Sequence, residues 1–300
     1  MNIVFEISGG IGKNIIATVI LELLRKKYSK DKIIVISDSK SIFFNNPHAD
    51  IVAGFDERNS ILNAYVHHQL HNCLVLIKDV YNEPDYISNK GNIYEVWAKM
   101  YDLEYNGEKP KLYLSEEEKL NPLKLNNTKP ILVIHPQGGA IIKDGENQLI
   151  SHYIKPLNYN WSRDLPIKLT KQIIENYKDE YDIYYIKHPS QPIIYEGAKP
   201  AEFNIRGIIS LLQQSDKRIL IDSFSQHMAA ALDLPSTVCW VTTKPEMLGY
   251  TIHNNIKSNP FEFETDMNCY SGYNLVEPLN HLPYKSTANI FNIKQITKWM

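Results

Sequence analysis

The sequence predicts an α/β protein built from two doubly wound, Rossmann-like domains. Three observations lead to this fold class. Short apolar runs alternate with stretches of helical period, a glycine-rich turn follows the first apolar run, and a polar segment with three prolines interrupts the alternation at residues 107–130. Continuous apolar strands are typical of a parallel sheet that helices cover on both faces. A chain of 300 residues has room for two domains of about 150 residues each.

The first half alternates strand and helix from its beginning. After the first apolar run, Ser8-Gly9-Gly10-Ile11-Gly12 breaks the pattern, and apolar side chains then recur at helical spacing. Arg25-Lys26-Lys27 follows, and cations favour the last turn of a helix. The expected strands are residues 3–7, 33–36 and 73–77, and the expected helices are residues 15–24, 60–70 and 93–100.

The second half repeats the pattern after the polar segment. Pro166 suits the first turn of a helix, and Ile293, Ile296 and Trp299 indicate a terminal one. The expected strands are residues 131–134, 183–186, 219–221 and 237–241, and the expected helices start at Pro166 and near residues 205–212 and 225–232. We therefore predict an N-terminal domain at residues 1–125, a C-terminal domain at 126–285 and a terminal helix at 286–300 that packs back on the domains.

Composition and charge exclude several classes. Lys and Arg number 32 against 34 Asp and Glu, so the net charge of -2 gives no global basic field for nucleic acid. Three cysteines without a CxxC pair predict no disulfide framework. No apolar run approaches the ~20 residues of a membrane span, and the N-terminus lacks the features of a signal peptide. We therefore expect a cytoplasmic protein with no integral membrane association.

The glycine-rich turn is a candidate ligand loop. Gly9-Gly10-Ile11-Gly12-Lys13-Asn14 matches neither the Walker A pattern nor GxGxxG, because Ile7, Asn14 and Ile15 stand at required positions. A glycine-rich turn between strand and helix still lets a ligand approach backbone N–H groups at a positive helix end. Gly9, Gly10 and Gly12 are therefore candidates for an acceptor or phosphate loop, and the alternative is a tight turn that merely connects two elements.

The strongest candidate binding motif is the block at residues 222–231. A strand delivers Asp222, Ser223 stands beside the next helix start, and Gln226 and His227 lie in its first turn. Free N–H groups at a helix N-terminus, with hydroxyls nearby, suit a diphosphate. The alternative is a well-capped helix with a buried histidine. Further candidates at expected strand ends or helix starts are Gly138, Gly139, Arg163 and Lys187.

Metal chemistry has a single weak candidate. His67, His68 and His71 have helical spacing that can bind a metal, but no adjacent carboxylate or cysteine completes a ligand set. A polar helix face is the preferred interpretation, and we expect no metal site. The sequence also has no HExxH and no GxSxG, which argues against zinc proteases and serine hydrolases. It has no DxD pair of carboxylates that could chelate a metal.

Together, the order of these segments resembles the heptosyltransferase-like glycosyltransferases of family 9. The resemblance rests on the glycine-rich turn and helix at 8–24, the segments 46–50, 131–139 and 161–163, and above all the block at 222–231. It implies the GT-B fold, with two facing Rossmann-like domains, and inverting, metal-independent transfer from a nucleotide sugar, which is a co-substrate, so that no cofactor is expected. It also implies that Asp222, Ser223 and His227 line the donor diphosphate and ribose, with Arg163 and Lys187 as candidates for the phosphates.

Two positions depart from the family pattern. Lys13 stands where family members usually carry the aspartate that acts as general base, and Arg206 stands near an expected acidic ribose contact, with Glu202 close by. A lysine is a poor base near neutrality and a better partner for phosphate or an anionic acceptor. Asp79 is our first candidate for the replacement base and Asp38 the second. Alternatively, each simply caps a loop.

Three functions follow as hypotheses. The first is glycosyl transfer to a cell-envelope saccharide. The second is transfer to a hydroxymethylated base in phage DNA. Two motifs that look like those of phage relatives of the family, GKN and DSFSQH, favour it. A basic groove would favour it too, lined by Lys26, Lys27, Lys30 and Lys32. The third is a catalytically silent protein that binds a nucleotide or glycan. The segments 139–160 and 242–272 are the expected donor-specificity loops.

Overall fold

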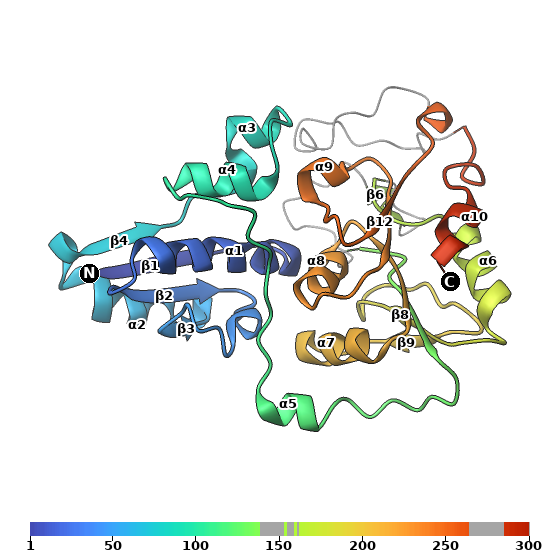
Figure 1. The fold of residues 1–300 in the computed structure, drawn as a ribbon, viewed down its shortest axis with the longest axis horizontal. Helices are drawn as coiled ribbons and strands as arrows, with labels where there is room; N and C mark the ends of the chain where they lie inside the picture. Colours follow the sequence, from blue (N-terminus) through green and yellow to red (C-terminus); the bar gives the residue numbers. More distant parts are fainter. Residues whose placement is uncertain (139–152, 155–158, 161, 264–284, 300) are drawn as a thin grey trace. The chain divides into compact units, whose positions relative to one another are not determined.

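The computed structural model describes residues 1–138, 153–154, 159–160, 162–263 and 285–299. The chain divides into two compact units, of which the first spans Met1–Pro122 and the second begins at Leu123. Figure 1 shows that each unit has its own sheet. Gly139, most of the expected specificity loop 139–160 and residues 264–272 of the second expected loop lie outside the described residues.

The first unit is built on a parallel sheet of four strands. Its strands are β1 (Asn2–Ile7), β2 (Lys32–Ser37), β3 (Ile51–Ala53) and β4 (Cys73–Leu76). Their order is β3-β2-β1-β4, because the chain steps outward from β1 to β3 and returns to the other side of β1. The strand order therefore reverses between β1 and β4, and ligands of such sheets bind at the carboxyl ends of the strands at this switch point.

Helices cover both faces of this first sheet. Neighbouring residues of a strand point to opposite faces, and the ring of Phe5 meets that of Trp97 on α4 (Ile93–Met100) at 6.0 Å between centroids. Val4 packs instead with Ile61 of α2 (Arg58–Leu62). The long helix α1 (Ile11–Lys27) contacts α4 and so lies on the Phe5 face.

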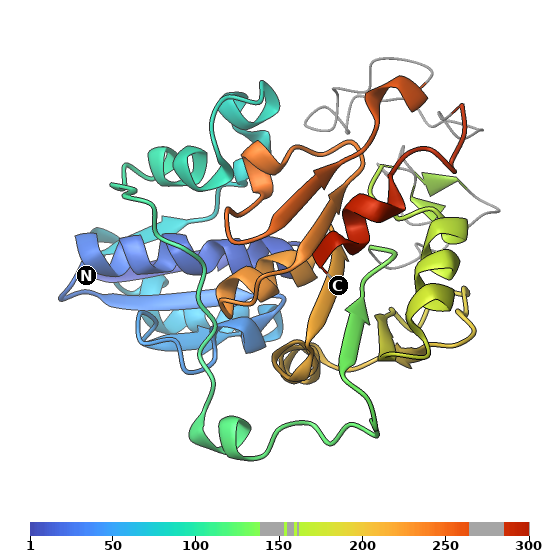
Figure 2. The ribbon, with the colours of Figure 1, turned by 45° about the vertical axis from the view of Figure 1, so that its right-hand side comes forward.

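The second unit has a parallel sheet of six strands in the order β12-β11-β10-β5-β8-β9. Counted from β9, this is the order 3-2-1-4-5-6 of dinucleotide-binding Rossmann folds, and the switch point lies between β5 and β10. Figure 2 shows β10, β11 and β12 side by side. The strands are β5 (Ile131–Ile134), β8 (Asp182–Ile186), β9 (Lys199–Ala201), β10 (Lys217–Ile221), β11 (Thr237–Trp240) and β12 (Asn254–Lys257).

One large apolar cluster holds the second unit together. It joins the sheet to α6 (Ile167–Tyr177) and to α10 (Ile293–Ile296), whose Ile296 is wholly buried. Between β9 and β10 lies α7 (Ile205–Gln214), and α8 (Phe224–Ala231) follows β10. Smaller elements are α3 (Pro84–Ile87), α5 (Glu116–Leu120), α9 (Pro245–Leu248) and the antiparallel pair β6 (Tyr153–Ile154) and β7 (Tyr159–Asn160).

The α/β class and the main strands and helices are confirmed, and three segments differ in detail from the expectation. The helix expected at 60–70 is the short α2 followed by a π-helical turn at Asn63–His67, because Asn, His, Tyr and Val are poor helix formers. The polar segment 107–130 contains α5, which a capping box of Ser115 and Glu118 starts. The terminal helix has a single α-helical turn, α10, followed by a 3-10 turn. Among the described residues, no helix combines the length and apolar character needed to cross a membrane.

Candidate functional site

Hydrogen bonds from a buried side chain hold the glycine-rich turn of the first unit in place. Gly9 has φ +103, in the left-handed region that favours glycine. The buried Asn14 amide donates to the carbonyls of Gly9 and Gly10, at 3.1 Å each, and its oxygen accepts from Ser37 Oγ at 2.5 Å. Asn14 therefore ties the turn after β1 to the end of β2, and sequence reasoning had noted it only as a departure from Walker A.

Lys13 and Asp79 bridge the switch point of the first sheet. Lys13 is in the first turn of α1, which follows β1, and Asp79 follows β4. Lys13 Nζ lies 2.9 Å from Asp79 Oδ2. The Lys13 side chain is 5% exposed and that of Asp79 36% exposed. The other carboxylate oxygen of Asp79 accepts from Tyr81 N at 3.0 Å, and Lys13 Nζ lies 5.4 Å from the Tyr81 ring centroid.

The three residues predicted as catalytic thus surround one turn. Asp38, at the end of β2, accepts from Gly9 N at 3.1 Å through Oδ2. Asp79 does cap a turn, as its alternative interpretation held, since it accepts from Tyr81 N at the start of the 3-10 turn Val80–Asn82. Lys13 forms an ion pair with Asp79, and its expected role as a partner for an anion stays a prediction.

In the second unit, the loops after β5 and β10 meet across the switch point. Buried His135 follows β5, and its Nδ1 lies 2.6 Å from Oγ of Ser225 in α8. Gly138 N donates to Asp164 Oδ1 at 2.9 Å. A Cβ on Gly138 would lie 3.4 Å from Ser223 Oγ, so two residues predicted to bind the donor are neighbours. His135, Ser225 and Asp164 were missed, although His135 directly follows a predicted strand.

Asp222 is buried at the same place. Burial raises the pKa of its carboxyl, while the charge of Arg163 and a hydrogen bond with Thr243 oppose that rise. Arg163 and Asp222, both predicted to bind the donor, are therefore electrostatically coupled. Asp164, the next residue after Arg163, is 2% exposed and accepts from Gly138 N.

Gln226 and His227 point into the second unit. Gln226 Nε2 donates to Leu248 O at 3.1 Å, and His227 Nδ1 lies 2.8 Å from Tyr250 Oη. Both side chains are buried. These contacts fit the alternative of a capped helix with a buried histidine, and donor contact by either residue stays a prediction.

Lys187 lies one strand away from the switch point. It follows β8 and forms an ion pair with Glu202, which follows β9. Glu202, which was noted near the expected ribose contact, thus neutralises Lys187, which was predicted to bind phosphate.

The remaining sequence candidates lie elsewhere. His67, His68 and His71 are exposed, and the described residues hold no group of three side chains suited to a metal. Lys26 pairs with Glu108 at 2.6 Å and Lys27 with Asp102 at 2.9 Å. Both lysines belong to the last turn of α1, at the end of the first unit opposite to the glycine turn. They therefore do not form an uncompensated basic groove.

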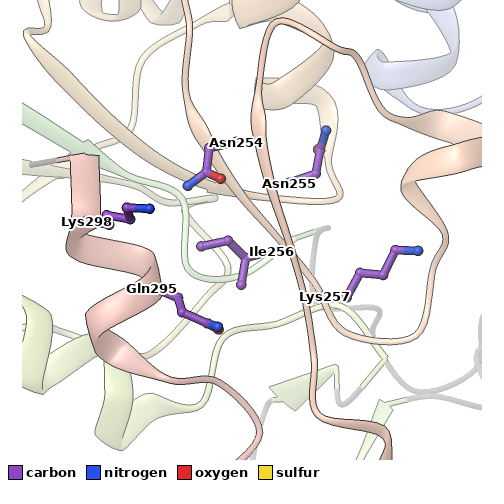
Figure 3. A pocket seen from close by; sticks show the side chains of 6 residues that line it. All are labelled: Asn254, Asn255, Ile256, Lys257, Gln295 and Lys298. Atoms are coloured by element: carbon purple, nitrogen blue, oxygen red, sulfur yellow. The ribbon is translucent and has the colours of Figure 1, made fainter.

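A cavity of about 370 Å³ lies at the edge of the second sheet. Figure 3 shows Gln295 and Lys298 of the C-terminal segment facing Asn254 and Ile256 of β12. Asn255 and Lys257 point to the other side of the strand. None of the predicted site residues lines this cavity.

Comparison with known proteins identifies the fold. No protein-family profile and no curated protein matches the sequence. Solved structures do match, among them a family 9 glycosyltransferase from Veillonella parvula, with a TM-score of 0.64 and 14% identity over 99% of this chain and 95% of that one. The chain has the fold of the family 9 glycosyltransferases.

Two Escherichia coli structures support the same fold. ADP-heptose lps heptosyltransferase II matches with a TM-score of 0.58 and 14% identity, over 86% of this chain and 90% of that one. The heptosyltransferase WaaC with ADP matches with a TM-score of 0.57 and 11% identity, over 90% of this chain and 96% of that one. The family 9 resemblance seen in the sequence is thus confirmed in the fold.

The Lys13–Asp79 pair predicts an asymmetry in stability. Asp79→Asn leaves the buried Lys13 ammonium without its carboxylate and should lower the free energy of unfolding by about 1–3 kcal/mol. Lys13→Met leaves a carboxylate that water reaches and should cost under about 1 kcal/mol. Urea denaturation of both variants and of the double variant measures this. Equal losses in the two single variants would contradict the assignment of Lys13 as the buried partner.

Buried histidines predict acid lability. Burial lowers the pKa of His135 and of His227 to about 3, and that of His253 to about 4. Between those values and pH 6.5, these histidines are protonated in the unfolded chain but stay neutral in the folded chain. Their contribution to the free energy of unfolding is therefore fully present above pH 6.5 and falls by about 1.4 kcal/mol per pH unit for each histidine as the pH decreases.

Urea denaturation between pH 7 and 5 tests this prediction. The slope of stability against pH should be shallower in His227→Gln by about one proton, and unchanged in His67→Gln, whose side chain is exposed. An unchanged slope in His227→Gln would show that His227 does not remain neutral in the folded protein.

Proposed function

We propose that this protein is a glycosyltransferase that moves a sugar from a nucleotide-sugar donor to an acceptor hydroxyl, with inversion and without a metal ion. One observation carries the proposal: Gly138, Ser223, Asp222 and Arg163 gather at the switch point of a six-stranded Rossmann sheet, beside the N-terminus of α8. The family 9 fold supports it, since a matching structure holds ADP.

The proposed donor site suits a diphosphate. The first N–H groups of α8 lack intrahelical partners and carry the positive end of the helix dipole. A Cβ on Gly138 would lie 3.4 Å from Ser223 Oγ, so the loop after β5 and the Ser223 hydroxyl are close enough to meet one pyrophosphate together. The guanidinium of Arg163 supplies positive charge for the leaving nucleoside diphosphate, which is the part of an inverting transfer that most needs electrostatic stabilisation.

Asp79 is the proposed general base. One carboxylate oxygen bonds Tyr81 N and the other Lys13 Nζ, so the group is oriented, and it remains 36% exposed toward solvent. A carboxylate has about four lone-pair sites, so two stay available for an acceptor hydroxyl. In the proposed step, Asp79 takes the hydroxyl proton, the acceptor oxygen bonds the anomeric carbon, and the bond to the diphosphate breaks with its electron pair on the leaving oxygen.

A cell-envelope saccharide is the proposed acceptor, because matching structures include a lipopolysaccharide heptosyltransferase. The modified-DNA alternative loses part of its support, since two of the four lysines expected to line a groove, Lys26 and Lys27, pair with acidic side chains. The binding-module alternative rested on the loss of the usual aspartate at position 13. Asp79, paired with Lys13 across the switch point, supplies a carboxylate in its place.

A panel of ADP-, UDP-, GDP- and CMP-sugars tests the donor site by thermal shift. We expect an ADP-sugar to stabilise the protein by about 2.7 kcal/mol at a hundred times its Kd. Gly138→Val should abolish this ligand-induced shift by filling the approach beside Ser223, and Ser223→Ala should reduce it. His67→Gln is the matched control. Absence of any shift at millimolar donor would count against the proposal.

Transfer assays test the base. Asp79→Asn should lower the transfer rate by about 10²–10⁴-fold, whereas 5 mM EDTA should leave the wild-type rate unchanged. The double variant Lys13→Met/Asp79→Asn separates catalysis from folding, because it removes both charges of the ion pair. It should recover stability while remaining inactive. A double variant that regains wild-type activity would exclude Asp79 as the base.

A further inference from the structure

We infer that Phe203 is the side chain on which the nucleobase of the donor stacks. This inference rests on the proposed function and deepens it, because it adds a contact for the base to the site proposed for the diphosphate. Phe203 was not among the sequence candidates. It comes two residues after the end of β9 and is 37% exposed.

Phe203 follows a strand of the half-sheet on which a nucleotide is expected. In the order 3-2-1-4-5-6, the first three strands form one of two mononucleotide-binding halves, and here they are β5, β8 and β9. The proposed diphosphate site is at the end of β5. Neighbouring strands are about 4.8 Å apart, so the end of β9 lies about 10 Å from that of β5. A ribose and a base attached to the diphosphate can span this distance.

Hydrogen bonds and an ion pair connect the loops that such a nucleoside would cross. Gln191, in the loop after β8, donates from Nε2 to the Gln137 carbonyl at 3.3 Å and accepts at Oε1 from His188 N at 2.9 Å. This joins the loop after β8 to the loop after β5. At the ends of β8 and β9, the ion pair of Lys187 and Glu202 offers polar groups for ribose hydroxyls, directly before the aromatic ring.

The first turn of α7 is shaped to receive Phe203. A Cβ on Gly207, in that turn, would lie 2.8 Å from Phe203 Cβ and 3.5 Å from its Cγ. Carbon atoms in contact are about 3.5–4.0 Å apart, so a larger residue at 207 would displace Phe203. Glycine is disfavoured within a helix, and the side chain of Asn204 bonds its N–H here at 2.8 Å. The base of the Phe203 side chain is thus fixed, while over a third of the residue stays accessible.

Its position distinguishes Phe203 from other exposed apolar residues. Single apolar residues on a surface are normal and need no explanation. Phe261, for example, is 80% exposed and follows β12, which belongs to the other half of the sheet. Phe203 instead stands beside polar groups at the carboxyl end of the nucleotide-binding half. Stacking on an aromatic ring is strong enough that alanine substitution weakens binding about 5- to 150-fold.

The experiment is a calorimetric titration of the full chain with ADP, or with UDP, GDP or CMP if one of these binds instead. Phe203→Ala should weaken binding at least fivefold. Phe203→Leu keeps apolar bulk against Gly207, so it should retain the thermal stability of the wild type but not its affinity. Phe203→Tyr keeps the ring and should retain both. Phe261→Leu is the matched control and should bind as the wild type does.

Proton NMR of the bound nucleotide separates stacking from a merely structural role. The base protons should move upfield on binding to the wild type and to Phe203→Tyr, because an aromatic ring current shields a stacked base. This displacement should be lost in Phe203→Leu.

Two outcomes would overturn the inference. Wild-type affinity and unchanged base-proton shifts in Phe203→Leu would show that the ring does not contact the base, and would leave the proposed donor site standing. Absence of binding by ADP, UDP, GDP and CMP to the wild type would refute the donor site itself and the inference with it.

Discussion

The carboxyl ends of parallel strands meet at one edge of a sheet, and every feature of the candidate site depends on this constraint. In each unit, the chain builds the sheet to one side of its first strand and then returns to the other side. Ligands of such sheets bind beside the two loops that leave adjacent strands at that point. Lys13 and Asp79 meet across the first switch point, and Gly138 and Ser223 meet across the second.

The two switch points differ in their chemistry. In the first unit, a buried ammonium is paired with a carboxylate, and a second carboxylate accepts a hydrogen bond from the backbone N–H of Gly9. In the second unit, burial lowers the pKa of His135 and raises the pKa of Asp222, and the charge of Arg163 opposes the rise at Asp222. Gly138 lies close to Ser223 at the same switch point. The first arrangement suits the activation of a hydroxyl, and the second suits the binding of a diphosphate.

Topology and burial explain where the structure places the sequence candidates. Asp222 and Gly138 were predicted from their place after strands, and parallel topology brings that kind of residue to the switch point. His227 was chosen for its chemistry, but α8 turns its ring toward Tyr250 inside the second unit. A helix start predicts which residues stand near its N-terminus and does not predict which way each side chain turns.

The sequence by itself determined the α/β class, the main strands and helices, the glycine turn and the loops that carry the candidate residues. These features depend on local periodicity and on residues such as glycine and proline, whose effects reach only a few positions. Tertiary structure alone decided that Lys13 pairs with Asp79, that Asp38 caps the glycine turn and that Asn14 holds it. The partners of the first two pairs are 66 and 29 residues apart in the chain, and no local pattern records which strands become neighbours in a sheet.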